Sequence, residues 1–113
     1  MIATLSIRKS WVSLLVPYDV GRYYRRLFLG QFGLKLEMPS RGEHITVISP
    51  EDKVDSDRIA VYNGSQCKFD VSLNLEWNGS AIWLPVISSD VGQFRQSLGL
   101  PPKTLHFCIG YIK

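Results

Sequence analysis

Two histidines, His44 and His106, are the only ones in the 113-residue chain, and each begins a similar short motif. The residues from His44 read HITV, and those from His106 read HFCI. With the alternation of a β-strand, His44 shares a face with Thr46, and His106 shares a face with Cys108. One neutral and one protonated imidazole can take a proton from an attacking oxygen and give one to a leaving oxygen without a metal ion. The pair therefore suits cleavage of a phosphodiester, because that reaction needs one proton transfer on each side of phosphorus.

The residue two positions after each histidine can assist this chemistry. The Thr46 hydroxyl can donate a hydrogen bond to a non-bridging phosphate oxygen, where negative charge builds in the transition state. Cys108 has the equivalent position in the second motif, and its thiol is a weaker donor with a larger atom. Neither motif contains a nearby carboxylate, so the two histidines form an incomplete ligand set. We expect no metal ion and no other cofactor.

A structural role for both histidines is the main alternative. A single histidine in an apolar strand is most often satisfied by a backbone partner and has no chemical role. Two histidines at matching positions of a repeated unit are harder to explain in that way. The strength of the catalytic interpretation therefore depends on whether the chain contains a repeat.

The first half of the chain reads as strand, helix and strand. The expected elements are a buried strand at 11–16, an amphipathic helix at 20–28 and a β-branched strand at 44–49. Asp19 is the expected N-cap of the helix, and Gly30 and Gly33 are its expected stops.

The last third repeats the same order of elements. The expected elements are a strand at 81–87, a helix at 91–98 with Val91, Phe94 and Leu98 on one face, and a strand at 105–111. Asp90 is the expected N-cap and Gly99 the expected stop. In the final strand, alternation places four residues on the face opposite the histidine: Leu105, Phe107, Ile109 and Tyr111.

The middle of the chain is less regular. Residues 50–58 are acidic and lack apolar periodicity, which predicts a loop, and residues 59–63 are a candidate strand. Residues 67–77 alternate, with one face made of Phe69, Val71, Leu73, Leu75 and Trp77. The Asn-Gly-Ser turn at 78–80 predicts a hairpin with the strand at 81–87.

The two helices can be aligned with an offset of 71 residues. This matches Asp19, Val20 and Gly21 with Asp90, Val91 and Gly92, Tyr23 with Phe94, and Leu27 with Leu98. His44 and His106 then occupy equivalent places. We expect an α+β fold with two pseudo-symmetric lobes of antiparallel sheet, one helix in each, and a central cleft between the imidazoles. It would be a single domain, 1–113, with lobe-like halves at about 1–50 and 58–113.

Composition agrees with a globular domain, since 45% of residues are hydrophobic and 20% charged. No run approaches the roughly 18 apolar residues of a membrane span, and no segment reads as an export signal. Two cysteines, Cys67 and Cys108, without a disulfide framework or metal-ligand spacing favour a reducing cytoplasm. We also expect a monomer. Residues 1–42 carry seven basic and two acidic side chains. They could attract phosphates, or Arg22, Arg25 and Arg26 could form a solvated helix face.

The two motifs resemble those of the 2H phosphoesterase superfamily, whose hallmark is a pair of H-x-[T/S]-hydrophobic motifs. HITV matches fully, HFCI matches except at Cys108, and the resemblance covers nearly the whole chain, including the approach LGLPPKTLHFCIGYIK. It implies a two-lobed α+β fold and a metal-independent phosphodiesterase. By this resemblance His44 and His106 would be the acid/base pair, and Thr46 and Cys108 would contact the substrate phosphate.

The resemblance also implies a substrate class. Nucleotide 2′,3′-cyclic phosphates, 2′–5′ linkages, short RNA and related cyclic nucleotides are the candidates. Members of the superfamily process RNA ends, degrade 2′–5′ oligoadenylates, or, as compact phage proteins, cleave the cyclic-nucleotide messengers of bacterial antiviral defence. The chain is small for the superfamily and in this respect is similar to the compact phage proteins. A phage protein of this kind would act in the host cytoplasm.

Other side chains are weaker candidates for substrate contacts. They are Trp11, Trp77 and Trp83 for stacking on a base, Lys103 and Arg41 for phosphate, and Tyr111. Tryptophans in strands usually belong to a core or an interface, and single basic residues are usually solvated. Alternation assigns Tyr111 to packing unless the strand twists or ends there.

Three interpretations remain open at the level of sequence. The first is the phosphodiesterase. The second is a nucleotide- or RNA-binding module of the same fold that does not cleave its ligand, which the thiol of Cys108 favours. The third is a structural or interaction protein with both histidines in its core.

Overall fold

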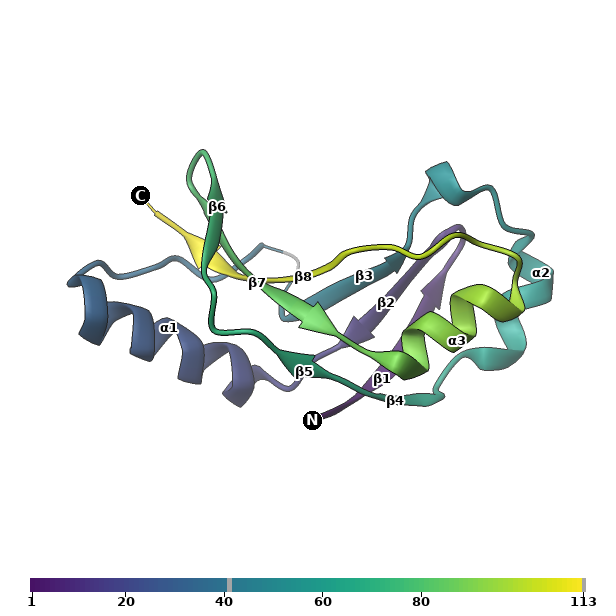
Figure 1. The fold of residues 1–113 in the computed structure, drawn as a ribbon, viewed down its shortest axis with the longest axis horizontal. Coiled ribbons are helices and arrows are strands. Elements are labelled where there is room, and N and C mark those ends of the chain that lie inside the picture. The colour runs from purple at the N-terminus through teal and green to yellow at the C-terminus, as the bar shows by residue number, and fades with distance from the viewer. Residues whose placement is uncertain (41, 113) are drawn as a thin grey trace.

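The computed structural model describes residues 1–40 and 42–112 (Figure 1). Its elements are β1 (Ile2–Arg8), β2 (Trp11–Leu15), α1 (Tyr18–Phe32), β3 (His44–Ile48), the 3₁₀-helix η1 (Pro50–Asp52), α2 (Ser56–Ile59), the 3₁₀-helix η2 (Ala60–Tyr62), β4 (Gln66–Lys68), β5 (Asp70–Val71), β6 (Glu76–Asn78), β7 (Ala81–Ile87), α3 (Ser89–Ser97) and β8 (Leu105–Tyr111). The predicted order of strand, helix and strand occurs in both β2–α1–β3 and β7–α3–β8. The protein is thus a mixed α+β structure, as expected.

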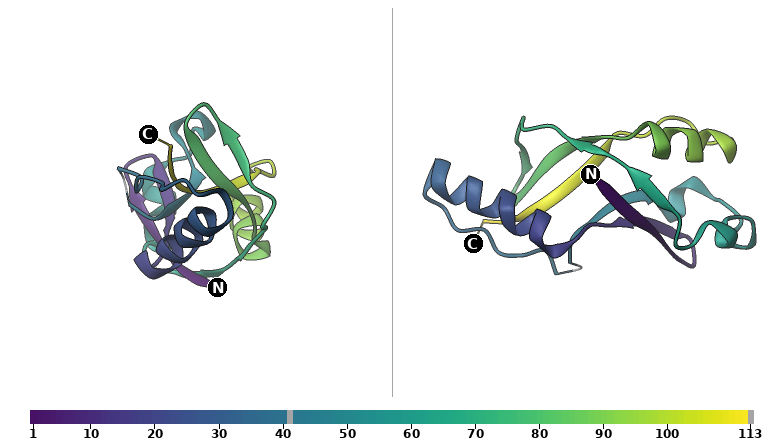
Figure 2. Two further views of the ribbon diagram at one scale, coloured as in Figure 1. Left: turned by 90° about the vertical axis from the view of Figure 1, so that its left-hand side faces the viewer. Right: turned by 90° about the horizontal axis from the view of Figure 1, so that it is seen from below.

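The strands form one antiparallel sheet whose two ends meet. Neighbours in the sheet follow the order β4-β1-β2-β3-β8-β7-β5, and β6 pairs with β7. The end strands β4 and β5 are separated in the chain only by Phe69. Phe69 is buried, and its backbone exchanges hydrogen bonds of 2.8 and 2.9 Å with Met1. The sheet is therefore nearly closed into a barrel, and its strong curvature is visible in Figure 2.

The core lies on one side of the central strands. In Figure 1, α1 lies toward one end of the molecule and α3 toward the other. Tyr24 of α1 meets Phe107 of β8 edge to face, with ring centroids 6.3 Å apart. The three residues predicted for the apolar face of the second helix are buried, Val91 and Phe94 within α3 and Leu98 as its C-cap. Burying these apolar side chains is the main favourable term for the fold, and it leaves the other face of the central strands available for polar residues.

The two long helices do not begin at the predicted residues. Pro17 is the N-cap of α1, and Asp19 lies in the first turn. Ser88 caps α3 with its own side chain, while Asp90 accepts a 2.7 Å hydrogen bond from the backbone N–H of Lys68. Both N-cap predictions are wrong. The helix dipole favours a carboxylate anywhere in the first turn, so residue type alone does not separate the cap from the positions after it.

The predicted helix ends are correct in two of three cases. Gly33 and Gly99 follow α1 and α3 with left-handed φ angles of 69° and 74°. Such angles are accessible to glycine without a steric penalty, which explains the residue type at both positions. Gly30 lies inside α1, so its prediction as a stop is wrong.

The middle of the chain differs most from the expectation. The predicted loop at 50–58 contains η1 and the start of α2, and the candidate strand at 59–63 is helical through η2. The expected single strand at 67–77 is divided among β4, β5 and β6. Phe69 is consequently buried while Trp77 is 71% exposed, so the predicted common face does not exist. The chain changes here from one edge of the sheet to the other, which a period-two pattern does not reveal.

The predicted hairpin is present as β6 and β7, which pair through Asn78 and Ala81. Strand β1 was not among the expected elements, although it pairs along its length with β2. In the part of the chain that the structure describes, no helix combines the length and apolarity required to traverse a lipid bilayer.

Candidate active site

The two histidine motifs lie side by side at the centre of the sheet. Ile45 of β3 is the antiparallel Cα partner of Phe107 of β8. Continuing this register in the antiparallel direction places His44 beside Cys108 and Thr46 beside His106. Ile45 and Phe107 are fully buried, so the alternating side chains of both motifs point to the open face. The four residues predicted to do chemistry are thus brought together on one surface.

Both motif strands contain an irregularity at the same place. In the pairing of β2 with β3, Val12 faces Ile48 and Ser13 faces Thr46, which leaves Val47 as an extra residue. In the pairing of β7 with β8, the equivalent extra residue is Ile109, directly after Cys108. Each is a β-bulge, a feature that re-aims side chains and is over-represented beside active sites. Each motif therefore ends in a bulge at its fourth residue.

The bulge in β8 changes the position of Tyr111. Cys108 faces Trp83 and Tyr111 faces Ala81, and these partners are two residues apart in β7. Tyr111 therefore shares the face of Cys108, and its assignment to the core by simple alternation is wrong. Burial, the largest effect, raises the pKa of the Cys108 thiol, and hydrogen bonding to the Gly110 backbone and the Tyr111 side chain lowers that pKa by less.

A crossing segment fixes this end of β8. Glu37 and Tyr111 exchange backbone hydrogen bonds of 2.8 and 2.9 Å. A side chain on Gly110 would collide with the Glu37 carbonyl and with Leu36. Gly110 is therefore required for the close approach of the two backbones.

One arginine from each long helix connects that helix to a bulge. Arg25 connects α1 to the bulge of the second motif, and Arg95 connects α3 to the bulge of the first motif. Nη1 of Arg25 in α1 donates a 3.0 Å hydrogen bond to the carbonyl of Ile109. Nη1 of Arg95 in α3 donates a 2.9 Å hydrogen bond to the carbonyl of Val47. Bulges leave backbone groups without a ladder partner, and these guanidinium groups supply one. The two ties therefore hold the motif strands in a fixed relation.

Each arginine is also paired with a carboxylate that flanks β3. Arg25 Nη1 lies 2.7 Å from Oε1 of Glu43, and Arg95 Nη1 lies 3.2 Å from Oδ2 of Asp52. Glu43 is almost fully buried, and neither of its oxygens accepts a well-oriented hydrogen bond among the described residues. Arg25 is thus its essential countercharge. The Arg95 guanidinium, by hydrogen bonding, holds the pKa of Asp52 below its usual range.

The arginines correct the predicted alignment of the two helices. With the offset of 71, Tyr23 and Leu27 should be buried like their counterparts in α3, but they are 57% and 44% exposed. An offset of 70 matches Arg25 with Arg95 and Phe28 with Leu98. Shared burial and shared hydrogen bonding support this second alignment. Arg25 is consequently not part of a solvated helix face.

His44 has a defined orientation. Its Nδ1 lies 3.1 Å from the carbonyl oxygen of Gly42, which can only accept a hydrogen bond. Nδ1 is therefore the donor, and in the neutral ring Nε2 has a free lone pair. The ring is half-buried. His44 is thus arranged as a proton acceptor at Nε2.

The surroundings of His106 are different. Its ring centroid lies 5.2 Å from that of Trp83, and its Nε2 lies 3.8 Å from Oε2 of Glu76. The same Glu76 oxygen accepts a 2.9 Å hydrogen bond from Trp83 Nε1. A carboxylate oxygen can only accept a hydrogen bond, so it suits a ring whose Nε2 carries a proton. Nε2 of His106 is therefore placed as a donor, in contrast to Nε2 of His44.

Glu76 was not among the residues singled out from the sequence. The hairpin of β6 and β7 makes it the cross-strand partner of Trp83. The turn at 78–80 was recognised, so counting back from it could have placed Glu76 opposite Trp83. The missing information was the register of Trp83 against Cys108, which depends on the bulge in β8.

A hollow of about 430 Å³ lies beside the first motif. It is lined by Ser6, Arg8, Trp11, Ser13, Leu15, His44 and Thr46. Trp11 therefore lines the same hollow as His44 and Thr46. Trp83 is also brought to the site, through its contact with His106.

Two of the predicted contacts, Trp77 and Lys103, are not placed at the histidines. Trp77 faces Ile82 across the hairpin, on the opposite face from Glu76. Lys103 lies in the link before β8, where its charge helps to lower the pKa of Asp52. Arg41 lies outside the described residues. Among the residues that the structure does describe, no three His, Cys, Asp or Glu side chains cluster in a way that could hold a metal ion.

Comparisons of the chain with protein-family models, with curated proteins and with solved structures find no match. The site is therefore interpreted from its own residues.

Proposed function

We propose that this protein is a metal-independent phosphodiesterase with two catalytic histidines, similar to the 2H phosphoesterases. One observation carries the proposal. The pairing of Ile45 with Phe107 gathers His44, Thr46, His106 and Cys108 on one open face of the sheet. The paired bulges and the two arginine ties support the further proposal that the chain consists of two pseudo-symmetric lobes.

The spacing of the histidines suits a phosphate group. His44 and His106 are diagonal neighbours across β3 and β8, and in a regular antiparallel pair such residues are roughly 7–8 Å apart. A phosphate between the rings can accept a hydrogen bond from one and place its attacking oxygen against the other. The two proton transfers then occur on opposite sides of phosphorus.

The different surroundings of the two rings support one assignment of their roles. Nε2 of His44 takes the proton of the attacking water or ribose hydroxyl, because Nδ1 donates to Gly42. As that oxygen bonds to phosphorus, the bond to the leaving oxygen breaks, and protonated His106 supplies its proton. The carboxylate of Glu76, 3.8 Å from Nε2 of His106, is placed to accept from a proton on that nitrogen. Both protons and both bonds are accounted for without a metal ion.

The remaining motif residues act on the non-bridging oxygens. The Thr46 hydroxyl is adjacent to His106 and can stabilise the charge that develops there. Cys108 is adjacent to His44, and its thiol also contacts the carbonyl of Gly110 at 3.8 Å. Since burial raises the pKa of this thiol, Cys108 remains neutral and does not repel the phosphate. It is nevertheless a weaker donor than a hydroxyl.

The proposed substrates are cyclic nucleotides, nucleotide 2′,3′-cyclic phosphates or 2′–5′ linked nucleotides, with antiviral cyclic-nucleotide messengers as one case. A nucleotide- or RNA-binding module without catalysis is the second candidate. The observation in its favour is the thiol of Cys108 at the position of the second hydroxyl donor.

The test is cleavage of this substrate panel by the purified protein in excess chelator, followed by chromatography. His44→Ala and His106→Ala are assayed in parallel to exclude contaminating nucleases. The proposal predicts cleavage by the unmodified protein and at least a 100-fold loss in each variant. Tight binding of a nucleotide without any product would favour the binding module instead.

A further inference from the structure

The open face of the sheet extends beyond the two histidines in one direction. Ser6 of β1 faces Ser13 of β2, and Ser13 faces Thr46 of β3. With Thr46 beside His106, these residues form a row of three hydroxyls that ends at the proposed acid. Neighbouring strands are about 4.8 Å apart, so the row extends roughly 10 Å from β3 to β1.

A basic and an aromatic residue lie at the far side of this row. Arg8 and Trp11 are cross-strand partners at the end of the β1–β2 hairpin. The Trp11 side chain is 41% exposed, and both residues line the hollow beside His44. Within the described residues Arg8 has no ion pair, in contrast to Arg25 and Arg95. Its charge is therefore available to a ligand.

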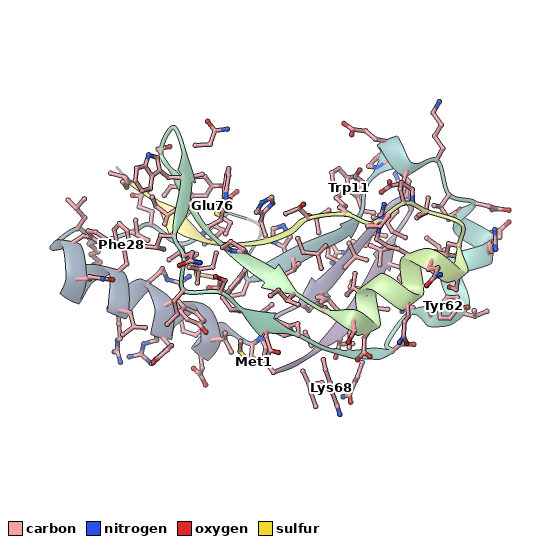
Figure 3. The ribbon with its side chains drawn as sticks, viewed as in Figure 1. Met1, Trp11, Phe28, Tyr62, Lys68 and Glu76 are labelled. Carbon is pink, nitrogen blue, oxygen red and sulfur yellow. The ribbon has the colours of Figure 1, made fainter. Side chains whose placement is uncertain are left out.

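The opposite direction is electrostatically different. Glu76 lies beyond His106, and Figure 3 shows it and Trp11 on the same upper side of the molecule, apart from each other along its long axis. A carboxylate repels a phosphate group, whereas Arg8 attracts one. Among the described residues, the charges therefore favour additional phosphate on the side of His44.

We propose that the hollow lined by Ser6, Arg8, Trp11 and Ser13 binds a nucleoside that carries a second phosphate. Its base stacks on Trp11, its ribose lies along the serine hydroxyls, and Arg8 binds the phosphate at its other end. The inference rests on the proposed function, because that function places the first phosphate of the ligand between His44 and His106. The substrate is then an oligonucleotide, linear or cyclic, in preference to a mononucleotide.

The test measures binding and does not require cleavage. Equilibrium affinities are determined by calorimetry for adenosine 3′,5′-bisphosphate and for its 3′- and 5′-monophosphates. The bisphosphate is expected to bind about tenfold more tightly than either monophosphate, in line with a charge-assisted contact at an exposed site. Arg8→Gln should abolish this difference. Arg22→Gln, on the exposed surface of α1, is the matched control and should leave it unchanged.

Two further arms sharpen the result. Trp11→Leu should weaken all three ligands about tenfold, because each carries the base. The affinities of a linear and a cyclic dinucleotide are then compared. The comparison shows whether the second phosphate is that of a linear or of a cyclic oligonucleotide. Equal affinity for the bisphosphate and the monophosphates, or an Arg8→Gln variant that keeps the difference, would overturn the inference.

These outcomes are separable from those of the cleavage assay. Cleavage without any advantage from a second phosphate would leave the proposed function intact and remove the subsite. Binding of the bisphosphate through Arg8 without any cleavage would support the subsite and favour the non-catalytic module.

Discussion

Ile45 and Phe107 are antiparallel partners at the middle of the sheet, and both side chains are fully buried. Their pairing therefore fixes both the core beneath the site and the geometry of the site itself. The residues on either side of them point to the opposite face, so the four motif side chains meet there. If either strand slipped by one residue relative to its neighbour, the side chains of its motif would point into the core.

The assignment of His44 as base and His106 as acid predicts a dependence on the leaving group. A p-nitrophenolate ester needs no proton on departure, whereas a ribose alkoxide does. His106→Ala should therefore lose at least 100-fold in kcat on the nucleotide substrate but less than tenfold on a p-nitrophenyl phosphodiester. His44→Ala should lose activity on both, and steady-state kinetics with the two substrates decide the matter.

Glu76→Gln supplies the control for this experiment. It should follow the pattern of His106→Ala with a smaller loss, since the amide keeps the contact with Trp83 but not the charge. Glu51→Gln, an exposed position in η1, should have no effect. The reverse pattern, with His44 the residue rescued by the good leaving group, would exchange the two roles.

The donors to the non-bridging oxygens give a second prediction. Thr46→Val removes a hydroxyl with little change of volume and should lower kcat about 10²–10³-fold, the usual cost of one oxyanion donor. Cys108→Thr restores a hydroxyl on the second strand and should raise kcat about tenfold. An unchanged kcat in Cys108→Thr, with folding confirmed by thermal unfolding, would show that this side chain does not touch the phosphate.

Stability at acid pH should depend on Asp52. Its pKa is lowered in the folded state by the hydrogen bond from Arg95, so the pair stabilises the fold above the unfolded pKa of about 3.9. This stability is lost as the pH falls through the folded pKa. Asp52→Asn should be less stable than the unmodified protein at pH 7, with the difference shrinking below about pH 4. Urea unfolding from pH 7 to pH 2 measures it, and a constant difference would contradict the assignment.

Two glycines of α1 should respond in opposite ways to alanine. A side chain on Gly21 would collide with the buried carboxylate of Glu43, which cannot move without breaking its pair with Arg25. Gly21→Ala should cost about 1–3 kcal/mol. Gly30 has open space around it, so Gly30→Ala should add about 0.5–1 kcal/mol. Denaturant unfolding compares the variants, and a stable Gly21→Ala would show that Glu43 is free to move.

Much of the site was predictable because it depends on local patterns. The alternation around His44 and His106 correctly places each histidine on the face opposite the core. The two strand, helix and strand units follow from apolar spacing, and the hairpin follows from the turn at 78–80. These are properties of short segments, in which neighbouring residues determine the outcome.

The rest depends on contacts between distant segments. A bulge at Ile109 moves Tyr111 to the other face, and the bulge is stabilised by Arg25 from 84 residues earlier. The helix alignment was shifted by one residue because the short identity at Asp19 outweighed the single match of Arg25 with Arg95. Period and composition do not encode which carbonyl an arginine will reach, so the ties became visible only in three dimensions.

The most direct test of the account is a double-variant cycle on kcat/KM for the best substrate, using His44→Ala, His106→Ala and the variant with both changes. Catalytic groups that act in one transition state are strongly non-additive, so the double variant should be about as slow as each single variant. Losses that multiply, or a single variant with nearly full activity, would show that the two histidines do not act together on one phosphate.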